Sequence, residues 1–130
     1  MSEMSIDVAD AMQAYLNDCG YDASAWPLPD DFDERLPFTR VTALGGSRRR
    51  RVLDTFRLQL ETWASTPAEA MAEALRVEAL VCDLEGATLG GVTCYAADVV
   101  TKPHDARDPY HPDLANVEAL AQITVRTAHV

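Results

Sequence analysis

Residues 38–64 read FTRVTALGGSRRRRVLDTFRLQLETWA, and this stretch decides the fold. Segment 38–44 is rich in β-branched residues, and segment 50–64 alternates between apolar and polar residues. Both patterns are typical of β-strands, and the alternation indicates that the second strand has one buried face. The glycines and serine at 45–47 have the composition of a tight turn. The stretch therefore predicts a β-hairpin whose arginines run from the turn into the second strand.

The second strand carries one unexpected carboxylate on its apolar face. Asp54 shares that face with Val52, Phe56 and Leu58, because alternate residues of a strand point to the same side. A buried carboxylate is stable when it is paired. We expect Asp54 to bind an arginine or a nearby turn, and a raised pKa with a catalytic use is the alternative.

Two helices flank the hairpin. Segment 6–19 has apolar residues at helical spacing, with Ser5 as the expected cap and Gly20 as the stop. Segment 66–86 opens with Thr66-Pro67-Ala68-Glu69, a capping box with proline at the first helical position, and ends before Gly86. Between the first helix and the hairpin, three prolines and clustered acids predict an irregular connection, pinned by Trp26 and Phe32.

Two further strands are predicted at 91–102 and 116–128, joined by a long proline-containing loop. The element order is α-β-β-α-β-β. This order favours an α+β fold in which a largely antiparallel four-stranded sheet has two helices packed on one face. At 130 residues the chain fits a single domain, residues 1–130, with an acidic front and connection at 1–37.

The charge is distributed unevenly along the chain. The formal net charge is −10, of which residues 1–34 carry −9, with nine acids and no lysine or arginine. An acidic protein repels nucleic acid, so we expect no specific nucleic-acid binding. The N-terminus lacks a basic signal-peptide region and no apolar run is long enough to span a membrane, which predicts a soluble protein made in the cytoplasm.

The sequence shows no catalytic, cofactor or metal signature. A GxSxG elbow, a P-loop and a GxGxxG motif are all absent. The loop from His104 to Asp113 contains His and Asp residues, but their spacing matches no known metal motif. We therefore expect no enzyme activity, no cofactor and no metal.

Several features resemble the tail-terminator (tail-completion, or minor tail) proteins of long-tailed phages and prophages. They are the strand entering Gly45-Gly46, the strand from Val52 to Trp63-Ala64, the capped helix after Thr66, and a proline loop before a strand closing on Thr124-Val125-Arg126. The resemblance covers residues 36–128.

The resemblance implies a helix-decorated sheet that assembles as a ring, typically of six copies, on the head-proximal end of the tail tube. Such a ring stops tube growth and presents the surface to which the head docks. The implied partners are further copies of the chain, the tail-tube protein and the head–tail connector, in the host cytoplasm during assembly and then in the virion tail. A free chain of this kind can remain monomeric until it meets its template.

We hypothesise that oppositely charged segments of neighbouring copies form the ring contact. The candidate interface residues are Arg48, Arg49, Arg50, Arg51, Asp30, Asp31, Asp33 and Tyr110. Three alternatives stay open: a head-side connector or stopper ring, a small ligand-binding or enzymatic α+β domain using Asp54 and the loop at 103–114, and an adaptor that binds nucleic acid through its basic loop.

Overall fold

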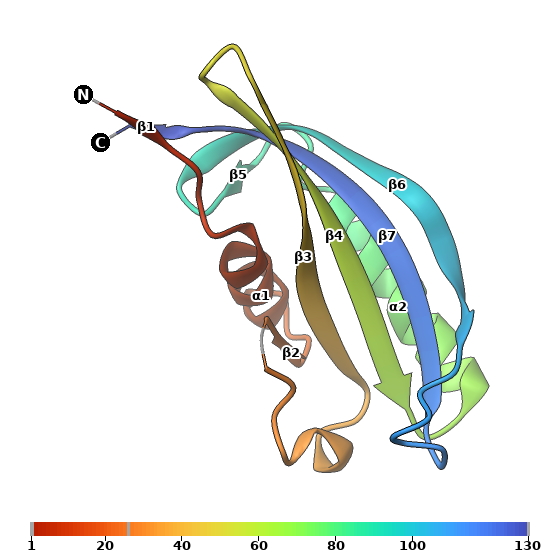
Figure 1. Ribbon diagram of the computed structural model, residues 1–130. Helices are drawn as coiled ribbons and strands as arrows, with labels where there is room; N and C mark the ends of the chain where they lie inside the picture. The colour runs from red at the N-terminus through yellow and green to blue at the C-terminus, as the bar shows by residue number, and fades with distance from the viewer. Residues whose placement is uncertain (1, 26, 130) are drawn as a thin grey trace.

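A curled six-stranded sheet forms the centre of the protein in a computed structural model, which describes residues 2–25 and 27–129 (Figure 1). The strand order across the sheet is β2-β3-β4-β7-β6-β5. Neighbouring strands are antiparallel, except that β2 and β3 run parallel. The long strands are β3 (Phe38–Arg49), β4 (Leu53–Ala64), β6 (Val92–Ala106) and β7 (Ala115–Arg126), and the short ones are β2 (Ala23–Ser24) and β5 (Thr88–Leu89).

A second, two-stranded sheet joins the two ends of the described chain. Strand β1 (Glu3–Met4) pairs antiparallel with β8 (Ala128–His129), so that Glu3 lies opposite His129. Both ends therefore lie together, beside the end of the main sheet from which the β3–β4 hairpin projects (Figure 1).

The expected α+β fold with a four-stranded sheet is wrong. Strands hold 46% of the residues and helices 24%, so the sheet dominates, and it has six strands and curls into a half-barrel. The additional strands are two residues long. Alternation cannot be recognised over two residues, and these strands form only because the tertiary fold brings their backbones to a partner.

Helices α1 (Val8–Asp18) and α2 (Pro67–Cys82) pack on the same face of the sheet and form one hydrophobic core with it. We call this face the inner face. Helix α2 packs on β4, β6 and β7, and α1 packs against β3 and β5. The Thr66 hydroxyl caps α2 as expected by accepting from the Glu69 amide at 3.2 Å. Helix α1 is capped by Asp7 instead of Ser5, with the Asp10 amide donating to Asp7 Oδ1 at 3.2 Å.

The expected GGS turn is also wrong. Strand β3 continues through Gly45 and Gly46 to Arg49, and the turn occupies residues 50–52. The glycines instead form a bulge, because the register of β3 against β4 shifts between Ala43 and Gly46. A Cβ at Gly46 would lie 1.8 Å from the Thr55 carbonyl oxygen, so only glycine allows the two strands to approach this closely.

The opposite face of the sheet, which we call the outer face, has an apolar cluster of its own at one end. Phe32, Phe38 and Trp63 are buried there, and the Phe32 and Trp63 rings meet edge to face at 5.4 Å. Phe32 lies in a short 3-10 helix, η1 (Phe32–Glu34), of the proline-rich connection. Phe32 thus pins that connection as expected, whereas Trp26 lies outside the described residues. The connection covers the end of the outer face where Phe38 and Trp63 lie.

Candidate assembly surfaces

The β3–β4 hairpin is fixed by an ion pair between a partly exposed arginine and a buried carboxylate. Asp54 is 3% exposed, and Arg48 donates to both of its carboxylate oxygens, from Nε to Oδ1 at 2.8 Å and from Nη2 to Oδ2 at 3.1 Å. The hydrogen bonds from Arg48 hold the pKa of Asp54 below its usual value despite burial. Asp54 therefore pairs with an arginine, as expected, and its carboxylate serves the structure of the hairpin.

Arg48 also ties the hairpin to the N-terminal segment. Its guanidinium donates to the Glu3 carbonyl oxygen at 3.1 Å and to Ser5 Oγ at 2.9 Å. Glu3 in turn accepts hydrogen bonds from Thr127 Oγ1 at 2.6 Å and from His129 Nδ1 at 2.7 Å, which lower its pKa. The hairpin, β1 and β8 thus form one connected structure.

The other three arginines form the end of the hairpin, and we call residues 49–51 the arginine tip. Their side chains are exposed, and within residues 2–25 and 27–129 none makes an ion pair. Arg50 and Arg51 have φ values of 56° and 64°, in the left-handed region that costs an ordinary residue about 1 kcal/mol. Glycine or asparagine is the usual occupant of such positions. The stability of the turn therefore does not explain why arginine occupies these positions. Residues held in unfavourable backbone conformations are typical of binding sites.

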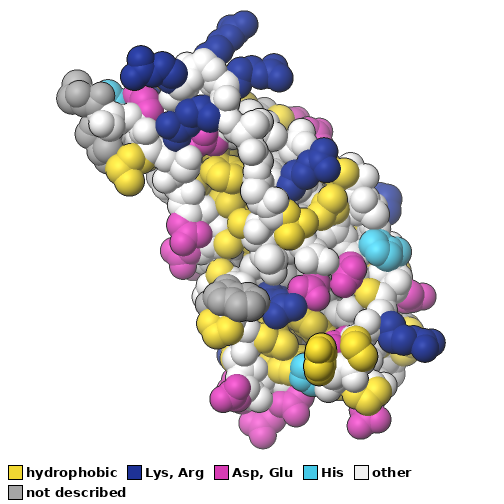
Figure 2. All heavy atoms as spheres, in the orientation of Figure 1, with side chains coloured by type: hydrophobic (Ala, Val, Ile, Leu, Met, Phe, Trp, Pro, Cys, Tyr) yellow, Lys and Arg dark blue, Asp and Glu magenta, His cyan; other side chains and the backbone are white. Residues whose placement is uncertain are grey.

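The segment between α1 and β3, which carries Asp30, Asp31 and Asp33 and which we call the acidic connection, lies at the opposite end of the molecule from the arginine tip (Figure 1). Figure 2 shows a group of basic side chains at the hairpin end and several acidic side chains at the other end, with charges of both signs between them. Asp31 lies 3.6 Å from Arg35, which also pairs with Asp22. The structure therefore does not bring Arg48–Arg51 together with Asp30, Asp31 and Asp33 within one chain.

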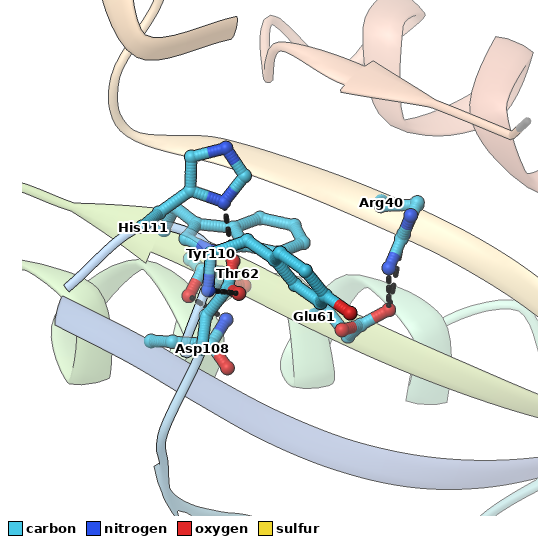
Figure 3. Close-up of polar contacts among 8 residues, drawn as sticks. Arg40, Glu61, Thr62, Asp108, Tyr110 and His111 are labelled. Carbon is cyan, nitrogen blue, oxygen red and sulfur yellow. Dashed lines mark hydrogen bonds and ion pairs between the residues drawn. The ribbon is translucent and has the colours of Figure 1, made fainter. Parts of the chain in front are cut away.

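A polar cluster on the outer face holds the loop between β6 and β7 (Figure 3). Asp108 accepts from Trp63 Nε1 at 3.0 Å, from His111 Nδ1 at 2.6 Å and from the Tyr110 amide at 3.0 Å. Burial alone would raise the pKa of Asp108, but these hydrogen bonds, led by that from His111, lower it. The cluster fixes the backbone of the loop while the Tyr110 side chain remains 87% exposed.

Next to this cluster, Arg40 and Glu61 form a cross-strand ion pair. Arg40 donates to Glu61 Oε1 from Nε at 3.0 Å and from Nη2 at 2.8 Å, and its guanidinium lies 5.4 Å from the Trp63 ring centre. Together with Tyr110 and Asn116 they line a hollow of about 380 Å³. Tyrosine, tryptophan and arginine in one hollow are typical of a protein–protein contact.

A groove lies between α1 and the turn that joins β5 to β6. Its volume is about 510 Å³. Its lining includes the apolar residues Ile6, Ala11 and Leu89 and the acidic residues Asp7, Asp10 and Asp18. We call it the α1 groove.

The structure separates the residues of the proposed enzymatic alternative. Trp63 contacts the loop through Asp108, so its position on β4 marks where the loop lies. Asp54 is nine residues from Trp63 along the same strand, a distance of about 30 Å. Asp54 is therefore too far from the loop to share a site with it. Among the described residues, no group of three or more His, Cys, Asp or Glu side chains is placed to hold a metal ion. The described part of the chain also contains no helix long and apolar enough to cross a membrane.

Sequence reasoning missed the outer-face cluster. Glu61 falls on the strand face that alternation assigns to solvent, yet it is buried because the connection and the β6–β7 loop fold over that end of the sheet. One signal was available, since Trp63 occupies the same polar face and a tryptophan there indicates a covering element.

Neither a protein-family model nor a curated protein matches this sequence. Among solved structures, the chain is similar to one described as "Virion of native gene transfer agent (GTA) particle". The two chains share 13% identity with a TM-score of 0.56, over 88% of this chain and 84% of the other. At this identity the similarity establishes a shared fold.

Proposed function

We propose that this chain is a structural protein of a phage-like virion and that it acts as a tail terminator. In that role it forms a ring, of about six copies by family resemblance, that caps the head-proximal end of the tail tube and provides the surface for head docking. The observation that carries the proposal is the fold shared with a chain of a virion particle over most of both lengths. The sequence resemblance over residues 36–128 supports the same conclusion.

The arrangement of surfaces supports a non-enzymatic, geometric role. The arginine tip and the acidic connection lie at opposite ends, and a contact between unlike surfaces of successive copies closes a ring when the rotation is right. Asp33 and the exposed Tyr110 line one hollow at the acidic end. We assign Asp30, Asp31, Asp33 and Tyr110 to a second contact surface, toward the next copy or the tail tube.

The test is to add the purified protein to growing tail tubes assembled from a tail-tube protein of the same phage-like particle. We expect rings at one end of each tube and an arrest of tube growth, measured by negative-stain electron microscopy. Tubes that grow unchanged would contradict the proposal. Binding to the head-side connector without any effect on the tubes would assign the chain to the connector or stopper ring instead.

A further inference from the structure

We propose that the arginine tip of one copy docks in the α1 groove of a second copy. This inference rests on the proposed function, because it names the contact that joins neighbouring copies in the ring. The contact joins two defined surfaces, the projecting arginine tip and the hollow α1 groove.

The α1 groove has the chemistry that an arginine side chain requires. Asp10 and Asp18 line it, and neither makes an ion pair with any other residue in the described ranges. The apolar residues of the lining suit the methylene stem of an arginine, and the carboxylates suit its guanidinium. Tyr15 adds an aromatic ring to the lining. The groove therefore accommodates both the apolar and the charged part of the same side chain.

The arginine tip is already held in a binding-ready position. Arg48 anchors the hairpin next to its turn through Asp54 and the Glu3 backbone, so the backbone of the tip loses little conformational entropy when the tip binds. Residues 49–51 lie at the projecting end of the hairpin (Figure 1), and their side chains are exposed. Arginine in two left-handed positions is consistent with selection for contact over turn stability.

Two observations favour the α1 groove over other acidic partners. In the acidic connection, Asp31 and Asp22 already share Arg35, so that segment has a cation of its own. A duplex nucleic acid is the other candidate for an arginine cluster, but the net charge of −10 on the chain repels a polyanion. A second copy of the chain also carries a negative net charge, but its acidic α1 groove lies directly at the contact and attracts the arginine tip there.

The test mixes two charge-reversed variants of the full chain. Variant one carries Asp10→Arg and Asp18→Arg, and variant two carries Arg49→Glu, Arg50→Glu and Arg51→Glu. Each variant alone opposes like charges at the contact, whereas in a mixture each tip meets a complementary groove. We expect association, measured by sedimentation velocity at low salt up to millimolar protein, to be about tenfold to a hundredfold weaker for each variant alone than for the mixture.

The control is Asp98→Arg with Asp105→Arg, which makes the same charge change at exposed positions outside both the α1 groove and the hollow that Asp33 and Tyr110 line. This control should associate like the wild type, and all variants should keep the circular-dichroism spectrum of the wild type. A mixture that associates no more than its separate components would overturn the inference. So would a tip variant whose sole loss is retention of a linear DNA duplex in a gel-shift measurement.

The outcomes separate this inference from the proposed function. If the wild type caps tubes but the mixed variants do not associate, the docking inference fails and the terminator role stands. If the mixture associates but the wild type leaves tube growth unchanged, the contact stands and the terminator role fails.

Discussion

Arg48 and Asp54 face each other across the β3–β4 hairpin and are joined by two hydrogen bonds, of 2.8 and 3.1 Å. The carboxylate is almost fully buried, while the guanidinium is partly exposed and reaches the N-terminal segment. Four consecutive arginines thus divide into two kinds. The first is structural, and the other three form the projecting tip.

Replacing Arg48 and Arg49 separately tests this division. Arg48→Ala leaves a buried carboxylate unpaired and should lower the free energy of unfolding by roughly 1–3 kcal/mol. Arg49→Ala removes an exposed side chain that has no ion-pair partner among the described residues, and should change the free energy by at most about 0.5 kcal/mol. Urea unfolding followed by circular dichroism measures both. Equal effects would mean that the ion pair does not stabilise the hairpin.

The two glycines of the β3 bulge should differ sharply in their tolerance of alanine. Gly46→Ala places a methyl group against the backbone of Thr55, which forces the strands apart and should cost about 3 kcal/mol or more. At Gly45 the added Cβ meets open space, and only the φ of +95° opposes it, at about 1–2 kcal/mol. Thermal unfolding of the two variants compares these costs. A Gly46→Ala protein as stable as wild type would contradict the close strand approach.

Strand β4 offers a matched pair of positions on its two faces. Leu58 is fully buried on the inner face, whereas Gln59 is partly exposed on the outer face. Leu58→Asp should unfold the domain because it buries a charge without a partner, and Gln59→Asp should leave it folded. Amide-proton spectra by nuclear magnetic resonance would distinguish a folded from an unfolded chain. Similar spectra for both variants would indicate an incorrect strand register.

Asp108 should contribute to acid sensitivity. Its pKa lies below the ordinary value of 3.8 in the folded protein, so its stabilising effect is complete above that value and is lost as the pH falls through the folded pKa. The wild type should therefore lose stability below about pH 4 more steeply than Asp108→Asn. Urea midpoints measured from neutral to acidic pH test this. Asp113→Asn, at an exposed position of the same loop, is the control for the removal of one carboxylate.

The elements that sequence could predict are those stabilised by their own residues. Helix α2 has a capping box and an apolar stripe, and β4 alternates between apolar and polar residues from Phe56 to Glu61, so the sequence predicts both elements to within a few residues. The pairing of Asp54 with an arginine also followed, because a buried carboxylate needs a cation nearby.

What could not be predicted depends on contacts between distant segments. The two-residue strands exist only because a long strand, or the other chain end, lies beside them. The bulge at Gly46 has the composition of a turn, and only the position of the Thr55 carbonyl shows its true role. The α1 groove is lined by residues 6–18 and residues 88–90, which are far apart in the sequence, so no local sequence pattern predicts it.

The pairing of β1 with β8 makes the chain nearly circular. Glu3 and His129 lie within hydrogen-bond distance, so a short linker could close the ends and new ends could be opened in an exposed loop. Such a permuted protein should keep the fold, because no strand of the main sheet would be interrupted. It also follows that any tag fused at either terminus emerges beside the arginine hairpin, whereas new termini in the β6–β7 loop would direct a tag to the opposite end of the molecule (Figure 1).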